Sequence, residues 1–168
     1  MSGASSNGID LLKRESVAEF NKWRISNLTL KLDISGQDFS GKNLEGAFLN
    51  GVVANGTSFA NANLSGSNLV QAELNSANFE GANLERTLLM YTEIKGANFA
   101  NANLTLTNFM WANAQDANFT GSKFFKTIMV ESLLQNANVP ADSSGAFLKY
   151  AKLDGTSWAL QGKDSAPH

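Results

Sequence analysis

Apolar residues recur at every fifth position through most of the chain. All 22 residues at this spacing from Ile34 to Val139 are apolar, and the register never slips. An α-helix repeats at about 3.6 residues and a strand at about two, so a period of five fits neither. The pattern therefore predicts a regular backbone of a different kind between residues 34 and 139.

The residue two positions before each of these apolar residues is small. From Ala47 to Ala137, the nineteen residues at this position are ten Ala, five Thr, three Ser and one Val. Close packing in a protein interior excludes larger side chains wherever space is narrow. The repeat thus has two restricted positions out of five, one small and one large and apolar.

Segments with the sequences ANLSG (62–66), ANFEG (77–81) and ANFTG (117–121) resemble the A(N/D)Lxx signature of pentapeptide-repeat proteins, a family with many bacterial and cyanobacterial members. The resemblance covers roughly residues 32–139. It implies an all-β solenoid, a right-handed quadrilateral parallel β-helix with four pentapeptides per coil. The large apolar residue and the small residue would point inward, and the other three would point outward.

A second period supports coils of four sides. Residues twenty apart would lie above one another, about 4.8 Å apart, which is the spacing of paired strands. One such column is occupied by phenylalanine throughout, at Phe39, Phe59, Phe79, Phe99 and Phe119. We interpret this column as core packing by offset aromatic stacking.

Both ends of a solenoid need a cap, because an open coil exposes its core and its unpaired backbone groups. We expect a flexible N-terminus over residues 1–8 and one capping α-helix over residues 9–27, with Asn7 as N-cap and Asp10 in the first turn. This helix also resembles the leader helix of many bacterial pentapeptide-repeat proteins. Its apolar stripe is formed by Ile9, Leu12, Val17, Phe20 and Trp23.

The five-residue register breaks at residues 140–145, PADSSG, and resumes one residue out of phase. We interpret this segment as a surface loop inserted into a β-helix that spans residues 28–160. Trp158 then falls at an inward position and is expected to close the phenylalanine column. Residues 161–168 are expected to be a disordered tail.

Residues that could perform chemistry are scarce. The chain has no cysteine, and its single histidine is the terminal residue His168. No nucleophile with a base, carboxylate pair, metal-ligand cluster or phosphate-binding glycine motif is evident. We therefore expect no catalytic, cofactor-binding or metal site, no small-molecule substrate and no enzyme activity. Without an apolar run typical of a signal peptide or membrane span, we expect a cytoplasmic protein with no membrane partner.

One side of the predicted rod differs from the other three. This side, here called the fourth face, is centred on Leu49, Leu69, Leu89, Phe109 and Met129. Apolar strips on a surface are typical of interaction sites. We consider three possibilities for this strip: coverage by the cap or a loop, a homodimer contact, and a contact with another protein. The expected interface residues are Phe48, Val70, Leu88, Met90, Tyr91, Leu106, Met110, Trp111, Ile128 and Val130.

These features favour a non-catalytic protein-interaction or scaffold module that presents a rigid rod to a protein partner. The resemblance implies an alternative, because some family members are quinolone-resistance proteins that mimic duplex DNA and bind gyrase. Such mimicry needs a strongly negative rod. Between residues 28 and 160, eleven acidic residues stand against eight basic ones. This balance disfavours DNA mimicry, and it also makes binding to nucleic acid unlikely.

Overall fold

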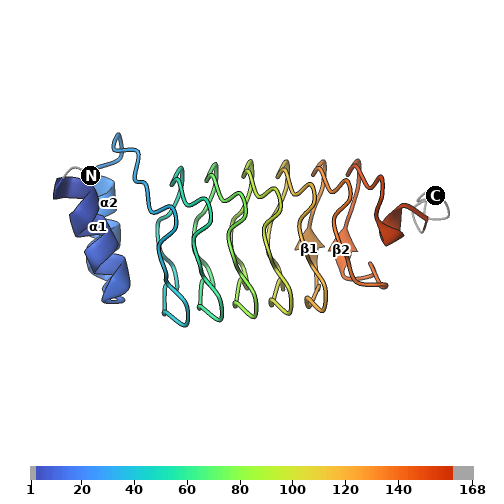
Figure 1. The fold of residues 1–168 in the computed structure, drawn as a ribbon, viewed down its shortest axis with the longest axis horizontal. Coiled ribbons are helices and arrows are strands. Elements are labelled where there is room, and N and C mark those ends of the chain that lie inside the picture. The colour runs from blue at the N-terminus through green and yellow to red at the C-terminus, as the bar shows by residue number, and fades with distance from the viewer. Residues whose placement is uncertain (1–2, 161–168) are drawn as a thin grey trace.

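The computed structural model describes residues 3–160, which form a straight rod (Figure 1). Two helices, α1 (Gly3–Lys13) and α2 (Val17–Ser26), lie across the N-terminal end. A stack of coils follows, and a short 3-10 helix, η1 (Ser157–Leu160), lies at the other end. The chain therefore has one long axis, along which successive coils are added.

Each coil pairs with the next through parallel backbone hydrogen bonds. Bridges join residues twenty apart, for example Asp33 with Val53 and Asn78 with Asn98. Extended pairing of more than one residue occurs only at β1 (Thr127–Ile128) and β2 (Ala146–Phe147) within the described residues. The predicted fold class, a right-handed quadrilateral parallel β-helix, is confirmed, and its sides are short segments separated by sharp turns.

The corners of the coil are tight turns that require one left-handed residue. The N–H of Gln37 donates to the carbonyl of Ile34 at 3.1 Å, and Gly36 between them has φ +65°. A four-residue turn with positive φ only at its third residue is a type II turn. The same hydrogen bond recurs along the rod: the N–H of the small residue of one pentapeptide donates to the carbonyl of the large apolar residue of the previous pentapeptide. Each turn therefore places a left-handed residue two positions after the large apolar one.

The core is a set of stacked columns inside the rod. Phe79 and Phe99 stack with ring centroids 4.8 Å apart and an angle of 4° between their planes. The other neighbouring pairs of the column have centroids 5.0 to 5.7 Å apart. Phe109, from the fourth face, meets Phe99 edge-on at 5.5 Å. The phenylalanine column is therefore the packed core that the sequence predicts, with no room for a ligand.

Hydroxyl groups at the small position are buried but paired. Thr57 and Thr107 are fully buried, and their Oγ1 atoms donate to the carbonyls of Ile34 and Leu84, both at 2.8 Å. A buried hydroxyl is tolerated when it has a hydrogen-bond partner. The small position therefore accepts Ser and Thr as readily as Ala.

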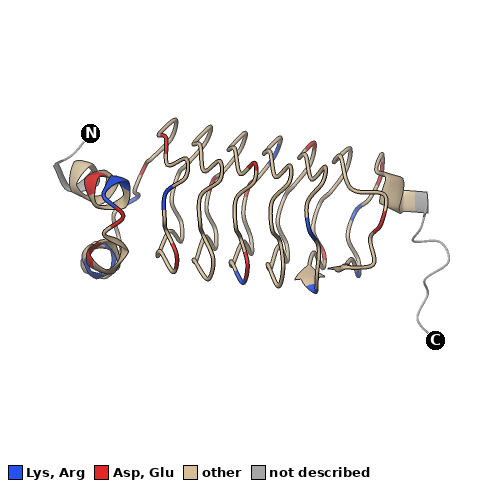
Figure 2. Cartoon of the chain, turned by 90° about the horizontal axis from the view of Figure 1, so that it is seen from below, with Lys and Arg blue, Asp and Glu red and all other residues tan. Residues whose placement is uncertain are grey.

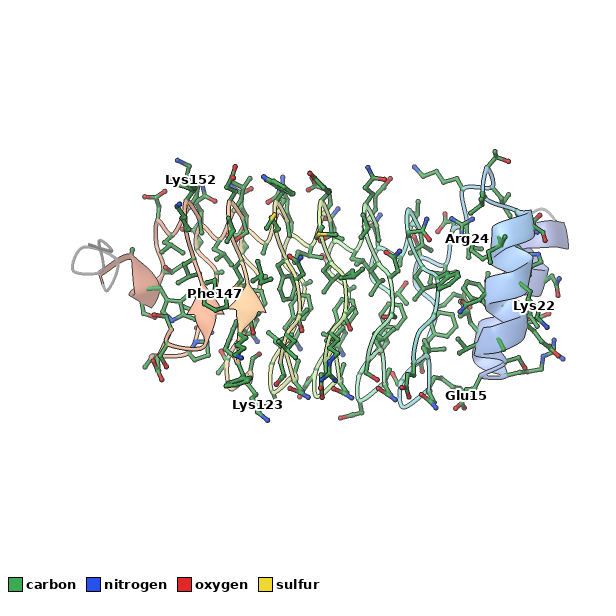
Figure 3. All side chains as sticks on the ribbon, turned by 180° about the vertical axis from the view of Figure 1, so that it is seen from behind. Glu15, Lys22, Arg24, Lys123, Phe147 and Lys152 are labelled. Carbon is green, nitrogen blue, oxygen red and sulfur yellow. The ribbon has the colours of Figure 1, made fainter. Side chains whose placement is uncertain are left out.

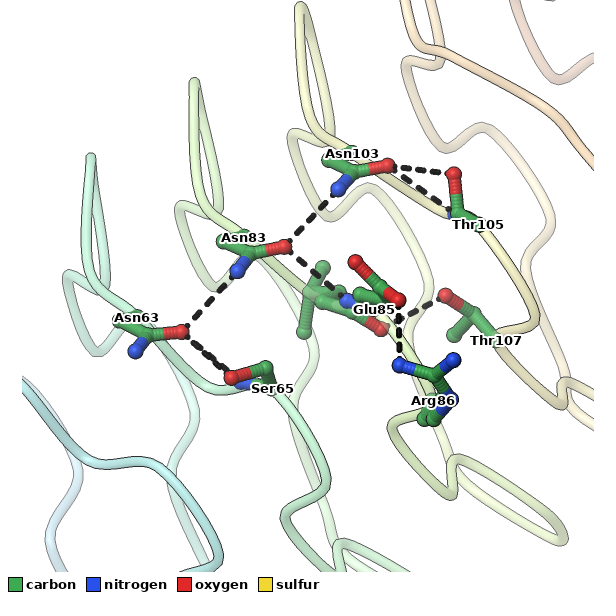
Figure 4. A network of polar contacts seen from close by, with 9 residues as sticks. Asn63, Ser65, Asn83, Glu85, Arg86, Asn103, Thr105 and Thr107 are labelled. Atoms are coloured by element: carbon green, nitrogen blue, oxygen red, sulfur yellow. Dashed lines mark hydrogen bonds and ion pairs between the residues drawn. The ribbon is translucent and has the colours of Figure 1, made fainter.

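Asparagine side chains form ladders along the outside of the rod (Figure 4). The Nδ2 of Asn83 donates to the Oδ1 of Asn63 at 3.1 Å, and Asn103 donates to Asn83 at 3.0 Å. The Oδ1 of Asn83 also accepts the backbone N–H of Glu85 at 3.2 Å. Each asparagine thus satisfies a backbone donor that would otherwise face solvent and links one coil to the next. These ladders account for a polar surface with few charges.

The N-terminal cap differs from the expected single helix over residues 9–27. Helix α1 begins at Gly3, so the expectation of a flexible segment over residues 1–8 is also wrong for its described part. Asn7 lies inside α1, and Asp10 lies beyond its first turn, so neither has the expected capping role. The stripe residues Ile9, Leu12 and Phe20 are nevertheless buried.

The break between the helices has a clear cause. Glu15 has φ +59°, and the N–H groups of Glu15 and Ser16 donate to the carbonyls of Leu12 and Leu11, both at 3.0 Å. This pattern is a Schellman motif, which terminates a helix and reverses the chain. A Cβ at Gly8 would lie 2.5 Å from the Trp23 ring, so glycine lets α1 and α2 pack closely. A period-3.6 stripe does not reveal such a reversal.

Side chains of the cap pair with the open edge of the first coil. The Nδ2 of Asn21 donates to the Gly46 carbonyl at 2.9 Å, and its Oδ1 accepts the Phe48 N–H at 2.8 Å. The Glu15 carboxylate accepts the N–H of Asn43 at 3.1 Å. This N–H is the main reason that the pKa of Glu15 lies below its ordinary value. These contacts take the place of the preceding coil.

Arg24 also bonds the cap to the first coil, from a buried position inside the cap (Figure 3). Arg24 is only 3% exposed, and its guanidinium donates to the carbonyls of Asn27, Leu30 and Asn50 at 3.0, 2.9 and 3.0 Å. Burial lowers its pKa below the ordinary value for arginine. The three carbonyls come from the end of α2, the linker and the first coil, so Arg24 joins the helices to the rod.

At the C-terminal end, the coil is one residue shorter. Thr127 pairs with Ala146 and Leu133 with Lys152, which are nineteen residues apart rather than twenty. The predicted phase shift at residues 140–145 is therefore present. It shortens one coil rather than inserting a loop into a full one.

Trp158 lies buried at this end of the rod, at the inward position that the sequence predicts. It is 1% exposed, and its Nε1 donates to the Pro140 carbonyl at 2.7 Å. Its ring meets the edge of Phe124 at 5.3 Å. Val139 follows Phe119 in the phenylalanine column, and Trp158 follows Val139 at the nineteen-residue spacing of this shorter coil, so the register places the indole at the end of that column, where it also meets Phe124 of the neighbouring one. The predicted tail, residues 161–168, lies outside the described residues.

Candidate interaction surface

The backbone ladder brings the predicted interface residues to one side of the rod. Bridges connect Phe48 with Asn68, Asn68 with Leu88, Leu88 with Asn108 and Asn108 with Ile128. These residues form one outward column of the fourth face. A second outward column lies on the other flank of the central core residues and contains Val70, Met90, Met110 and Val130.

The two aromatic residues of this surface pack against each other. Tyr91 and Trp111 stack with centroids 4.6 Å apart and 15° between their planes, yet they remain 51% and 41% exposed. Phe48, Leu88 and Leu106 are also exposed, while the residues of the second column and Ile128 are half-buried. One face of each ring is used in their mutual stack, so a partner would meet the ring edges and the outer faces.

Three exposed aromatic residues near this surface were not predicted from the sequence. Phe147 pairs with Ile128 and continues the first column, and it is 55% exposed. Phe125 and Tyr150 are 52% and 68% exposed. Phe147 and Tyr150 follow the one-residue phase shift, so counting by fives and twenties does not assign them to the fourth face. Figure 3 shows Phe147 between Lys152 and Lys123, which lie on opposite edges of the rod.

The corners that border the fourth face carry unusual residues at the left-handed position. On the other two corners, this position is occupied only by Gly, Asn, Ser or Asp, which adopt positive φ with little cost. On the two corners beside the fourth face, Gly46, Gly51 and Gly66 occupy it in the first coils, but large side chains take it in the later coils, with φ between +51° and +61°. These residues are Arg86, Leu106 and Lys126 on one edge and Gln71, Tyr91, Trp111, Glu131 and Tyr150 on the other.

No segment within residues 3–160 covers this surface. The cap contacts the end of the rod through Glu15, Asn21 and Arg24 and leaves Tyr91 and Trp111 exposed. The possibility that the cap folds over the strip is therefore wrong. The fourth face remains an unpaired apolar surface in the described part of the chain.

Charged residues are scattered along the rod (Figure 2), and they are sparse in the two outward columns of the fourth face. The first column, from Phe48 to Phe147, contains no charged residue, and the second has only Lys149 at its C-terminal end. Acidic residues elsewhere are partly neutralised, as in the ion pair between Lys31 and Glu73 at 2.9 Å. The surface is therefore suited to an apolar contact more than to an electrostatic one.

The described residues show little that could support chemistry. They contain no group of three or more His, Cys, Asp or Glu side chains placed to hold a metal. An open hollow of about 470 Å³ lies beside residues 140–145. The Asp142 carboxylate there is occupied by the N–H and hydroxyl of Ser144, both at 2.9 Å, and these bonds lower its pKa. None of the described helices is long and apolar enough to span a membrane.

Coils of four short sides, stacked at twenty residues per turn, define the class of this protein as a right-handed quadrilateral β-helix. The family profile described as pentapeptide repeats (8 copies) matches residues 33–69, 55–89, 67–105 and 92–129, more than half of the chain. The chain belongs to the pentapeptide-repeat family. No curated protein sequence matches it.

Several solved pentapeptide-repeat structures are similar to the chain. One is the protein Rfr23 from the cyanobacterium Cyanothece 51142, at 24% identity over 84% of this chain and 99% of that one, with a TM-score of 0.37. Another is HetL, involved in heterocyst differentiation regulation in the cyanobacterium Nostoc, at 20% identity over 81% of each chain and a TM-score of 0.35. The plasmid-mediated fluoroquinolone resistance protein QnrB1 matches at 19% identity over 74% of this chain and 76% of that one, with a TM-score of 0.43. Matches at this level indicate a shared fold only.

Proposed function

We propose that this protein is a non-catalytic interaction module whose contact surface is the fourth face. The observation that carries the proposal is the row of large side chains held at positive φ on the two bordering corners. A left-handed conformation costs a residue with a side chain roughly 1–2 kcal/mol. Glycine, which fills the same position at many other turns, would avoid this cost. Strained backbone of this kind clusters at functional sites.

The exposed stack of Tyr91 and Trp111 gives the surface its chemical character. Aromatic residues and Met are enriched in the cores of protein interfaces, where few residues carry most of the binding energy. Here Met90 and Met110 lie directly beside the stacked rings. This combination supports a protein partner. A cytoplasmic location belongs to the same proposal and is supported by a sequence without cysteine.

DNA mimicry is the alternative function, and charge density argues against it. Duplex DNA carries one negative charge per about 1.7 Å, so a mimic would need about three net negative charges per coil at a coil spacing of about 4.8 Å. The whole chain has a net charge of only −2. A gyrase supercoiling assay tests this directly: inhibition or drug protection at micromolar protein would favour mimicry over our proposal.

Affinity capture tests the role of the fourth face. The bait would be the wild type or a Tyr91→Asn, Trp111→Asn double variant, because asparagine tolerates positive φ and keeps the turns. The matched control is Asn101→Gly, at a left-handed corner away from the fourth face. We expect the double variant to lose specific partners that the wild type and the control retain. Equal recovery with all three baits would refute the proposal.

A further inference from the structure

We propose that the partner of the fourth face is the fourth face of a second copy, with the two rods antiparallel. This inference rests on the proposed function and names its partner. The pairing would be a two-fold symmetric dimer, in which the same patch of both copies meets itself. Three features of the described residues support it: residue size along the edges, charge along one edge, and the apolar centre.

Both edges have glycine in the N-terminal coils and larger residues in the later coils. One edge begins with Gly46 and Gly66 and ends with Lys126. The other begins with Gly51 and ends with Tyr150. The two-fold axis of the antiparallel pair lies in the contact plane, perpendicular to the rods and at the level of the aromatic stack. It places the N-terminal end of each edge opposite the C-terminal end of the same edge in the other copy. Tyr150 of one copy then lies over Gly51 of the other, and Lys126 lies over Gly66, while Tyr91 lies over Trp111 at the centre.

Parallel rods would not fit in this way. A two-fold axis along the rods brings opposite edges together at the same level. Leu106 would then face Trp111 at one end, while Gly46 would face Gly51 across an unfilled space at the other. The parallel pair would gain an ion pair between Lys126 and Glu131, but its two ends could not be packed equally closely. Close packing at an interface core requires matched shapes. The antiparallel arrangement is therefore the one that the edge profile favours.

Charge also runs in one direction along the edge that contains Arg86. Exposed Glu45 lies at its N-terminal end, and exposed Lys126 lies near its C-terminal end. In the antiparallel pair, Lys126 lies opposite Gly66 and within one coil of Glu45 of the other copy. Neither side chain has an ion-pair partner among the described residues, although the Glu45 carboxylate accepts the Nδ2 of Asn63 at 3.4 Å and the Lys126 ammonium lies 5.5 Å from the centroid of the Phe125 ring. Opposite charges that meet at the rim of an interface favour one orientation over the other.

The centre of the pair would be the stack of Tyr91 and Trp111 from each copy. The face is small. Six levels about 4.8 Å apart span roughly 25 Å, so the contact lies below the about 800 Å² per partner of a standard interface. The dimer should therefore be weak and concentration-dependent.

Sedimentation velocity on the full chain, from about 1 to about 100 µM, would measure this equilibrium. We expect the wild type to shift from monomer to dimer over this range. Trp111→Asn should weaken dimerisation by at least about 30-fold, as expected for an interface hot spot. Glu80→Lys, on the side centred on the phenylalanine column, is the control and should dimerise like the wild type. Circular dichroism would check that each variant is folded.

A charge exchange tests the orientation. Lys126→Glu and Glu45→Lys should each weaken the dimer, and the double variant should recover it, because the two residues come within one coil of each other only in antiparallel rods. A wild type that stays monomeric would overturn the inference, as would a dimer that Trp111→Asn leaves intact. If the wild type is monomeric but fourth-face variants still lose a captured partner, the proposed function stands and the second copy is the wrong occupant. If the wild type is monomeric and the fourth-face variants also retain every captured protein, both the proposed function and this inference are wrong.

Discussion

The left-handed corner position offers a reciprocal test of the strain argument. Gly51 and Gln71 occupy this position on successive coils of the same edge, at φ +64° and +60°. A Cβ at Gly51 would have nothing within 4 Å, so Gly51→Gln creates no clash. The exposed Gln71 side chain makes no ion pair or ring contact in the described residues. Each substitution therefore changes the torsional energy of the corner residue and little else.

The expected magnitude follows from two opposing terms. The left-handed conformation costs a non-glycine residue roughly 1–2 kcal/mol. Glycine, in turn, has greater freedom in the unfolded chain, which costs about 0.4–1 kcal/mol on folding. Gln71→Gly should therefore raise the free energy of unfolding by about 0.5–1 kcal/mol, and Gly51→Gln should lower it by a similar amount.

Urea unfolding of both variants would measure these changes as shifts of the midpoint at an unchanged slope. A matched control is Asn61→Gly on another edge, where asparagine already tolerates the conformation and the gain should be smaller. If Gln71→Gly leaves stability unchanged or lowers it, large residues at these corners are not strained. The main support for a functional fourth face would then be lost.

Three further predictions concern the cap and the core. Arg24→Met should lower the free energy of unfolding by about 2–4 kcal/mol, because three carbonyls lose a charged donor. The loss is limited because the variant no longer buries a cation that has no anionic partner. Phe79→Ala should lower it by about 3–5 kcal/mol, because the stack around Phe79 cannot collapse over the cavity. Glu15 has a lowered pKa when folded, so its contribution is present above its ordinary pKa of 4.5 and is lost as pH falls through the folded value. Glu15→Gln should therefore flatten the acid part of a stability-against-pH curve.

Each of these predictions has its own control. Arg24→Lys should be milder than Arg24→Met, because lysine retains one charged donor; equal loss would mean that packing dominates. Phe79→Leu should cost less than Phe79→Ala in calorimetry, since Leu fills the equivalent position of the neighbouring column. For the acid titration, Glu19→Gln in α2 is a control without an ion pair in the described residues. If it flattens the curve as much as Glu15→Gln, the contact with Asn43 is not responsible.

Much of the rod could be predicted because its constraints repeat. Every coil imposes the same inward positions, so a period of five and a column such as Phe39 to Phe119 reveal the fold. The caps do not repeat and were less predictable. The reversal at Glu15 depends on a single residue with positive φ, and glutamate gives no sign of it.

The candidate surface was only partly predictable for related reasons. The positions of Tyr91 and Trp111 on one side follow directly from the register. Phe147 and Tyr150 were missed because the coil before them is one residue short. The sequence also does not show that large corner residues are strained, since the turn type, and hence the sign of φ, becomes known only from the structure.

The fixed register of the coils limits how this surface can change through insertion or deletion. Loss of five residues would keep every inward residue inside, but it would move all later residues to the next side of the rod. The fourth face would then be cut in two, with its C-terminal half turned by a quarter of a turn. Gain or loss of twenty residues would only lengthen or shorten it. Variants of this chain that differ in length by whole coils should therefore retain a continuous binding surface, and those that differ by one side should lose it while remaining folded.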